Sequence, residues 1–211
     1  MLLLCALVAG VSSVWATAYN GVFNKITTSD DFTTGYYVVT SSESAATIKA
    51  LGSTVDSNKR MPGQNVTISN GTITNPDNSI VWYITVSGTI ITMKNVNTNT
   101  YLYQASTTSG KGMGLKAASA NLTFTGYSTT SPVGFKFTLD GASCNIFKWN
   151  NGSAWFANYT GAYNASMTPV TLYKLEESSK TPNPSISGTT PYTFTTNVTI
   201  TNDEDAEDAT I

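Results

Sequence analysis

Hydrophobic and polar residues alternate with a period of two along much of the chain, most plainly in 81–86 and again in 89–93. A period of two places successive side chains on opposite faces of a β-strand. The pair Ser87-Gly88 stands between the two runs, where a tight turn would join two antiparallel strands. The pattern therefore predicts a β-hairpin here, followed by an aromatic strand at Tyr101–Tyr103.

A weaker copy of this stretch follows 53 residues later. The aligned pairs are Trp82 and Phe135, Ile84 and Phe137, Val86 and Leu139, Gly88 and Gly141, Ile91 and Cys144, Met93 and Ile146, Leu102 and Trp155, and Tyr103 and Phe156. A third, poorer echo at Gly35–Leu51 would give three units and favours a trefoil-like barrel as one option. Because Cys144 aligns with Ile91, we expect it to be a small buried hydrophobic residue rather than a reactive thiol.

Other segments of the same region carry strand and turn signals but no sustained helical period. Strands are predicted at 35–39, 65–68, 71–73, 121–127 and 170–175; turns or loops are predicted at Pro62-Gly63, 104–115, Asp140-Gly141 and 149–152. Turn signals at this density are typical of an all-β fold, either a β-sandwich or a closed β-barrel.

The two ends of the chain differ from this region. A short apolar run at 2–11 followed by Ala16-Thr17-Ala18 predicts a secretory signal peptide at 1–18, so the β-rich module is expected at 19–175. Residues 176–183 carry acidic, serine and proline residues, which favour a linker. Residues 184–211 are too few to bury a core and are expected to be the start of a truncated domain.

Two resemblances to known modules follow from these segments. Pro184-Ser185-Ile186-Ser187-Gly188, with Phe194, Val198-Thr199-Ile200 and Ala209-Thr210-Ile211, resembles the opening of a chitobiase/β-hexosaminidase C-terminal-type repeat. That resemblance implies partial Ig-like strands, and it implies an accessory module rather than a hexosaminidase.

The second resemblance covers residues 19–175. Phe32-x-x-Gly35-x-Tyr37, Trp82-x-Ile84, Tyr101-Leu102-Tyr103 and the ending at 169–175 resemble an N-terminal β-rich module of large secreted proteins of Bacteroidetes-type bacteria. This resemblance implies architecture and an extracellular location, and it implies no mechanism.

Composition narrows the possible chemistry. The chain of 211 residues contains no histidine, which excludes Ser-His-Asp catalysis and His-ligated zinc within it. Its net charge is −2, so no overall field draws it to nucleic acid. Between residues 19 and 174 there are ten lysines or arginines against six acidic residues, but they form no stripe along the sequence.

Candidate ligand-binding residues gather in one segment rich in asparagine and glycine. They are Trp149, Asn151, Trp155, Tyr159 and Tyr163. Sugar rings stack on aromatic side chains while amides bond their hydroxyl groups, which is why this mixture indicates a glycan site. The alternative is that Trp149 and Trp155 are core residues of the repeat.

No catalytic residues are predicted. Asp30, Asp31, Glu43, Asp56, Asp77 and Asp140 are the acids of residues 19–175, and the sequence places no two of them on one face at catalytic separation. The acidic run at 203–208 lacks the spacing of an EF-hand and is expected to be a solvated loop. We therefore expect no metal and no cofactor.

These observations predict a non-catalytic module of a larger secreted or cell-surface protein, which binds carbohydrate or serves attachment. The alternative is a ligand-free spacer of a secreted hydrolase whose catalytic domain lies outside this chain. The expected partners are an extracellular glycan or cell-surface component and further domains of the same polypeptide. Nucleic acid and a membrane span are not expected.

Overall fold

The computed structural model describes residues 21–141 and 143–176. Apart from one 3-10 turn, η1 (Asn78–Ile80), every regular element in this part of the chain is a strand, which confirms the all-β prediction. No helix in these residues is long and apolar enough to cross a membrane. The predicted signal peptide, the linker beyond residue 176 and the Ig-like segment at 184–211 lie outside the described residues.

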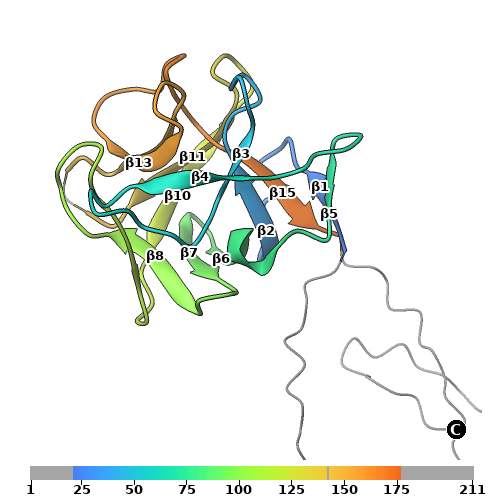
Figure 1. The fold of residues 1–211 in the computed structure, drawn as a ribbon, viewed down its shortest axis with the longest axis horizontal. Coiled ribbons are helices and arrows are strands. Elements are labelled where there is room, and N and C mark those ends of the chain that lie inside the picture. Colours follow the sequence, from blue (N-terminus) through green and yellow to red (C-terminus); the bar gives the residue numbers. More distant parts are fainter. Residues whose placement is uncertain (1–20, 142, 177–211) are drawn as a thin grey trace, which may run out of the picture. The chain divides into compact units, whose positions relative to one another are not determined.

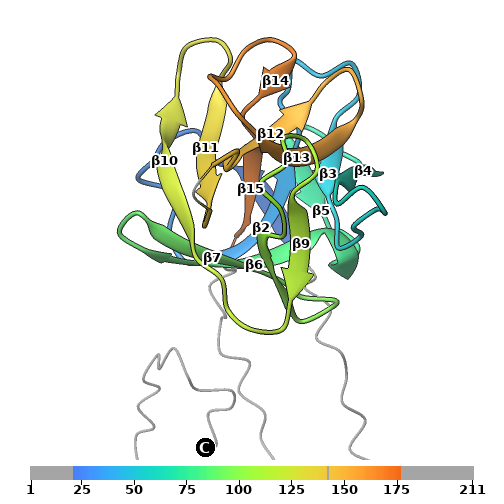
Figure 2. The same ribbon diagram turned by 90° about the vertical axis from the view of Figure 1, so that its left-hand side faces the viewer.

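Six strands pair in a ring and form a closed barrel, seen from two sides in Figure 1 and Figure 2. Five of the six junctions are antiparallel ladders. The sixth is a single bridge in which Phe135 N donates to Val170 O at 2.8 Å and Val170 N donates to Phe135 O at 3.1 Å. In order round the barrel the strands are β2 (Gly35–Thr40), β6 (Val81–Ser87), β7 (Ile90–Asn95), β10 (Leu122–Ser128), β11 (Gly134–Leu139) and β15 (Thr171–Leu175).

Three hairpins complete a threefold arrangement. They are β3 (Lys49–Leu51) with β4 (Met61–Asn65), β8 (Thr100–Gln104) with β9 (Met113–Lys116), and β12 (Ile146–Asn150) with β13 (Trp155–Tyr159). Each unit runs from one barrel strand through a hairpin to the next barrel strand: β2-β3-β4-β6, β7-β8-β9-β10 and β11-β12-β13-β15. This is the trefoil-like barrel among the predicted options. The short strands β1 (Val22–Lys25), β5 (Thr72–Thr74) and β14 (Met167–Thr168) are additions to it.

The structural repeat differs in phase from the repeat found in the sequence. The offset of 53 residues in the sequence matched β11, β12 and β13 with β6, β7 and β8. In the structure, the counterparts of β11, β12 and β13 are β7, β8 and β9. Consecutive strands here are antiparallel and alternate with the same period, so a shift by one whole strand preserves the hydrophobic match. The poorer echo at 35–51 covers β2 and β3, the first two strands of a structural unit.

The shift in phase also moves Cys144. It lies between β11 and β12 in the connection formed by residues 140–145, is partly exposed and has φ of +48°. Its predicted counterpart, Ile91, is instead buried in β7. The expectation of a buried strand residue is therefore wrong, and Asp140-Gly141 belongs to this longer connection rather than to a two-residue turn.

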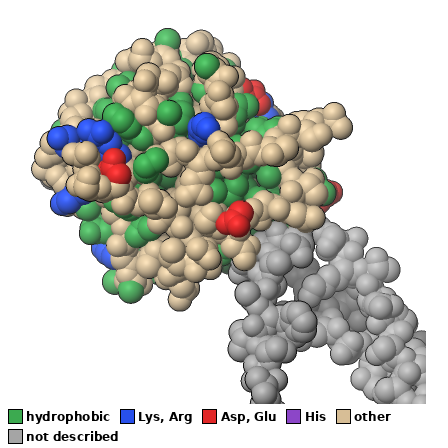
Figure 3. Space-filling model, in the orientation of Figure 1, with side chains coloured by type: hydrophobic (Ala, Val, Ile, Leu, Met, Phe, Trp, Pro, Cys, Tyr) green, Lys and Arg blue, Asp and Glu red, His purple; other side chains and the backbone are tan. Residues whose placement is uncertain are grey.

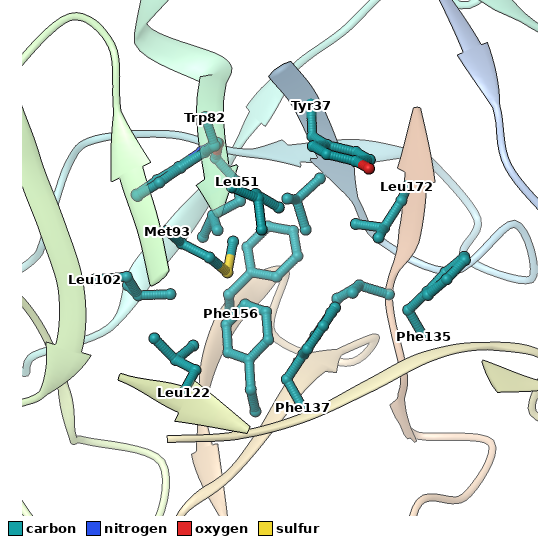
Figure 4. Packing of buried hydrophobic residues seen from close by; sticks show 14 of the residues in the cluster. Tyr37, Leu51, Trp82, Met93, Leu102, Leu122, Phe135, Phe137, Phe156 and Leu172 are labelled. Carbon is teal, nitrogen blue, oxygen red and sulfur yellow. The ribbon is translucent and has the colours of Figure 1, made fainter. Parts of the chain in front are cut away.

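The main core fills the barrel with side chains at alternate positions of its strands, as Figure 4 shows. Tyr37, Trp82, Met93 and Phe137 have no exposed surface, and all four point inward. Trp82 Nε1 donates to the backbone oxygen of Leu51 at 2.8 Å, so this buried ring also satisfies its polar atom.

A smaller core lies on the outside of the barrel, between the barrel strands and the pair β1–β5. It contains Phe23, Val38, Ile73, Val81 and Tyr173, all buried. Val38, Val81 and Tyr173 occupy outward positions of β2, β6 and β15, since their neighbours along each strand point into the barrel. These three strands are therefore buried on both faces.

Pro62 and Gly63, predicted as a turn, lie inside β4. Phe156 and Trp155 of β13 pair with Met61 and Pro62, and Gly63 N donates to Ala154 O at 3.0 Å. A Cβ at Gly63 would lie 2.6 Å from Lys49 Cβ and 2.8 Å from Trp149 Cη2. Glycine is needed here for close packing and not for a turn.

The substitution Gly63→Ala is expected to lower the free energy of unfolding by about 1–3 kcal/mol, because Trp149 or the backbone of β4 must move to admit the methyl group. Chemical denaturation followed by tryptophan fluorescence measures this change. Gly152→Ala is the matched control, since a Cβ there meets only Asn150 Oδ1 at 3.6 Å. Equal losses in both variants would contradict the packing role of Gly63.

Candidate functional site

The five predicted ligand-binding residues lie on the β12–β13 hairpin and in the loop that follows it. Two of them are buried: Trp149 is 1% exposed and Tyr159 is 9% exposed. The Trp149 ring packs against Phe156 with 4.8 Å between ring centres. Neither buried ring offers a free face to a molecule in solvent, so these two residues serve the core.

Trp155 is partly exposed, but its polar atom and one ring face are already engaged. Its Nε1 donates to Tyr159 Oη at 2.9 Å, and Asn150 Nδ2 donates to the same oxygen at 3.0 Å. The guanidinium carbon of Arg60 lies 4.0 Å from the centre of the Trp155 ring. Arg60 Nε also donates to Gly110 O at 3.2 Å, so the stacked arginine joins three segments of the chain.

Asn151 and Tyr163 hold the loop after β13 against the barrel. Asn151 Nδ2 donates to Ala165 O at 2.7 Å. Tyr163 Oη donates to Phe147 O at 3.1 Å and lies 3.3 Å from both the nitrogen and the oxygen of Phe137. The hydroxyl thus pins the loop to β11 and β12.

Lys148, buried to 1% exposure, supports the same loop from below. Its Nζ donates to Thr160 O at 3.2 Å, Gly161 O at 2.9 Å and Ala162 O at 2.7 Å, and it lies 5.2 Å from the centre of the Tyr163 ring. Burial lowers the pKa of the Lys148 ammonium group. Three carbonyl acceptors and a ring face compensate for the loss of water around this charge.

The predicted residues therefore do not form a single open surface: Trp155 and Tyr159 bond to each other, Asn151 and Tyr163 bond to backbone atoms, and Trp149 is buried. Their part in ligand binding stays a prediction. The alternative interpretation of Trp149, that it is a core residue, agrees with its burial.

A pocket forms instead at the seam of the barrel, where β11 and β15 meet only through the bridge between Phe135 and Val170. Its volume is about 220 Å³. The end of β1, the loop after β2, the end of β10 and the start of β11 contribute its walls. The residues that line it are Lys25, Ile26, Ser42, Glu43, Ser44, Tyr127, Ser131, Pro132, Val133, Gly134, Phe135 and Thr171.

The pocket combines both signs of charge with hydroxyl groups and two aromatic rings, those of Tyr127 and Phe135. Lys25 Nζ lies 2.7 Å from Glu43 Oε1, and the two side chains are 29% and 51% exposed. Ser42 Oγ and Ser44 Oγ are 2.9 Å apart beside this ion pair. Tyr127 packs against Phe135 with 4.7 Å between ring centres and supplies the aromatic wall. Such a set of groups can accept and donate hydrogen bonds on one side and pack against an apolar face on the other.

Sequence analysis missed this pocket because its three principal residues, Lys25, Glu43 and Tyr127, lie far apart along the chain. Only the closure of the barrel brings β1, β2 and β10 to one end. Glu43 was counted among the acids, but nothing in its local pattern indicates Lys25 as a partner.

A second hollow of about 340 Å³ lies at the other end of the β10–β11 pair. Asp140, Asn121 and Asn145 give it polar groups, and no aromatic side chain lines it. Within residues 21–141 and 143–176 no group of three or more potential metal-ligating side chains is present.

The acids of this region have identifiable local partners in several cases. Asp77 Oδ1 accepts from Ser79 N at 2.8 Å at the start of η1, and these bonds lower the pKa of the Asp77 carboxyl group. Asp56 Oδ1 accepts from Arg60 N at 2.8 Å, and Asp31 Oδ2 accepts from Thr28 Oγ1 at 2.7 Å. These contacts fit turns and caps.

Comparison with known proteins gives little further guidance. No protein-family model matches the chain, and no curated protein matches it. Among solved structures, the chain is similar to the crystal structure of the Rhizoctonia solani agglutinin, with a TM-score of 0.47 and 12% sequence identity, over 68% of this chain and 96% of that one. A likeness at this level carries no inference about function.

The substitution Tyr163→Phe tests the structural role of a predicted site residue. Burial raises the pKa of Tyr163, whereas an unfolded tyrosine ionises near pH 10. The contribution of its neutral hydroxyl to stability is therefore complete below about pH 10 and is lost above it. We expect Tyr163→Phe to lower the free energy of unfolding by about 1 kcal/mol at neutral pH. Above about pH 10, the free energy of unfolding of the variant should decrease less steeply with pH than that of the native protein.

Denaturant titrations at neutral and alkaline pH measure both effects. Tyr101→Phe, on the outer face of β8, is the control and should change stability by less than about 0.5 kcal/mol. A Tyr163→Phe protein with unchanged stability and an unchanged alkaline slope would show that the hydroxyl does not hold the loop.

Proposed function

We propose that residues 21–176 form a non-catalytic carbohydrate-binding module, and that the seam pocket takes one sugar ring of a neutral glycan. The observation that carries this proposal is the meeting of an ion pair, several hydroxyl groups and the Tyr127 ring in a single open hollow. A sugar presents the complementary surfaces, since hydroxyl groups surround its ring and C–H groups give it an apolar face.

The charges of the pocket favour a neutral ligand. Lys25 and Glu43 neutralise each other at 2.7 Å, so the pocket has no net charge to attract an ion. A sugar hydroxyl can donate to Glu43 and accept from Lys25 at the same time. Hydrogen bonds to charged groups are stronger than those between neutral groups, so these two side chains would orient the ring.

The size of the pocket favours a single ring. Its volume of about 220 Å³ is below the range of about 300–1,000 Å³ usual for drug-sized ligands. A longer glycan would extend from the pocket over its rim, where Val133 is 43% exposed.

The proposal extends to cellular context. The signal-peptide pattern at 1–18 and the low charged fraction of 11% support a secreted or cell-surface module of a larger protein. The absence of histidine and the local partners of several acids support a role without catalysis. An extracellular glycan is then the expected partner.

A second candidate is the ligand-free spacer. The observation in its favour is the internal bonding of the β12–β13 hairpin, where Arg60 covers a face of Trp155 and Trp149 is buried. In a spacer without a ligand, the aromatic side chains would serve packing within the fold, as these do.

A glycan array probed with the full chain separates these candidates, since a spacer retains no neutral glycan. For any neutral glycan retained, Glu43→Gln is expected to weaken binding by about tenfold or more. The reason is that a hydrogen bond to a charged group contributes about 1.5–3 kcal/mol. Isothermal titration calorimetry measures the loss, and we expect the variant to keep its fold because the Glu43 side chain is 51% exposed.

Tyr127→Ala should also weaken binding, through loss of the aromatic wall. The control is Ile90→Ala, which removes an exposed hydrophobic side chain at the start of β7, outside the residues that line the pocket. Retention of a neutral glycan with full affinity by both pocket variants would move the site elsewhere on the module.

A further inference from the structure

Tyrosine and lysine side chains alternate in a row across the outer face of four neighbouring strands. Tyr83 of β6 pairs with Lys94 of β7, Lys94 pairs with Tyr101 of β8, and Tyr101 pairs with Lys116 of β9. Directly opposed residues in a sheet lie on the same face. We call Tyr83, Lys94, Tyr101 and Lys116, together with Tyr103 beside them, the Lys–Tyr ladder.

The alternation of each strand places the ladder outside the barrel. Trp82, Met93 and Leu102 are fully buried in the main core, and each is the direct neighbour of a ladder residue along its strand. The ladder side chains are all partly exposed. They form a face that solvent reaches, supported from below by the packed barrel.

The rings and ammonium groups of the ladder contact one another. Lys94 Nζ lies 5.5 Å from the centre of the Tyr101 ring, and Lys116 Nζ lies 4.9 Å from the centre of the Tyr103 ring. These distances place the charges over the rings in cation–π contacts.

Gly114 on β9 allows Tyr103 to lie flat on the sheet. A Cβ at Gly114 would lie 2.6 Å from Tyr103 Cε1 and 2.9 Å from Tyr103 Cζ. The ring therefore crosses the backbone of β9 at the position that pairs with Tyr103. The consequence is a low, broad face rather than a pocket.

The charge of this face is not neutralised within the described part of the chain. The ion pair found among residues 21–141 and 143–176 is Lys25–Glu43, and neither residue belongs to the ladder. Lys94 and Lys116 are two strand spacings apart, about 10 Å. The basic character extends beyond β9, since Met113 N donates to Lys59 O at 2.8 Å and places Lys59 and Arg60 beside that strand.

Figure 3 shows lysine and arginine side chains gathered on the side of the molecule where Figure 1 labels β8, with few acidic atoms among them. A partner that complements this side carries negative charge at intervals along an extended chain. It also carries groups that bond to tyrosine hydroxyls.

We propose that the Lys–Tyr ladder binds an anionic polysaccharide, a chain of sugar rings that bears carboxylate or sulfate groups. The anionic groups lie against Lys94 and Lys116, and the sugar hydroxyls bond with Tyr83, Tyr101 and Tyr103. The inference does not rest on the seam pocket, because no ladder residue lines that pocket.

Single-stranded nucleic acid fits the ladder less well. Its bases bind proteins by stacking on bare aromatic faces within a strongly basic groove. Here the lysines of the protein itself already occupy faces of Tyr101 and Tyr103. The polymer must therefore bind through charge and hydroxyl groups, which a polysaccharide offers along its whole length.

Affinity electrophoresis of the full chain in gels containing polygalacturonate, dextran sulfate or neutral dextran tests this inference. We expect retardation by at least one of the two anionic polymers, none by dextran, and weakening by added salt because exposed charges are screened. The double variant Lys94→Gln/Lys116→Gln is expected to weaken retardation by about fivefold or more, a loss in keeping with two exposed charge contacts.

The control is Lys136→Gln/Lys174→Gln, which makes the same change in charge on β11 and β15, away from the ladder. Lys136 is itself 5.7 Å from the Tyr163 ring centre, so it matches the kind of contact removed. An equal loss in this control, or no retardation of the native chain by either anionic polymer, would overturn the proposal. Retention of a thymidine oligonucleotide through Lys94 and Lys116 without binding of either polymer would also overturn it, in favour of nucleic acid.

Loss of anionic binding in the ladder variant leaves the test of the seam pocket intact, because Glu43→Gln is assayed with neutral glycans. The two proposals therefore fail separately.

Discussion

The bridge between Phe135 and Val170 is the constraint on which the rest of the structure depends. β11 also pairs with β10 and β12, and β15 with β2 and β1, but the bridge alone joins the start of β11 to the start of β15 and closes the ring. Without it, the backbone groups of Phe135 and Val170 would lose their partners in the barrel. The bridge is a single residue pair with two hydrogen bonds, whereas each of the other five junctions registers two or more residue pairs. Closure is therefore achieved with the smallest possible overlap, and the packing of Phe135, Phe137 and Leu172 inside the barrel supports it.

A short junction has a geometric consequence. Beyond the bridge β15 pairs with β1 instead of β11, and residues at the ends of β1 and β10 and in the loop after β2 line the gap between β11 and β15. The seam pocket is the space that remains. The ladder arises in the opposite way, since β6, β7, β8 and β9 are joined through registered pairs that align their outward residues in one row. Irregular pairing thus produces a hollow, and regular pairing produces a flat face.

The sequence alone predicted the all-β class and the trefoil-like option, because both depend on periodicity and on turn spacing. The burial of Trp82 agrees with its position in a clean alternation. Periodicity could not reveal the phase of the repeat, which is why Cys144 was expected in a strand. It also could not reveal why Gly63 is a glycine, since the reason is the Trp149 ring from a distant strand.

The predicted binding residues illustrate a different limit. Trp155 and Tyr163 each have an aromatic ring and a polar atom that can form hydrogen bonds. Composition cannot distinguish a ring that stacks on a sugar from one that stacks on Arg60. The candidate site depends on Lys25, Glu43 and Tyr127 lining one pocket, and these residues lie in segments that the sequence gives no reason to join. Part of the ladder was predicted, since the sequence indicated a strand at Tyr101–Tyr103. Which lysines lie opposite these tyrosines depends on the register of strand pairing, which the sequence does not show.

The electrostatic difference between the two surfaces is itself informative about how one small module could contact a complex glycan. The seam pocket is neutral because its charges are paired, so binding there depends on hydrogen-bond geometry and should respond little to salt. The ladder lysines have no ion-pair partner in the described part of the chain and lie on a partly exposed face, where attraction is longer in range but weaker at contact. A polymer held loosely at the ladder would raise the local concentration of its sugar rings at the same module. Two weak surfaces of different chemistry can in this way give selectivity that neither has alone, provided that a single chain reaches both.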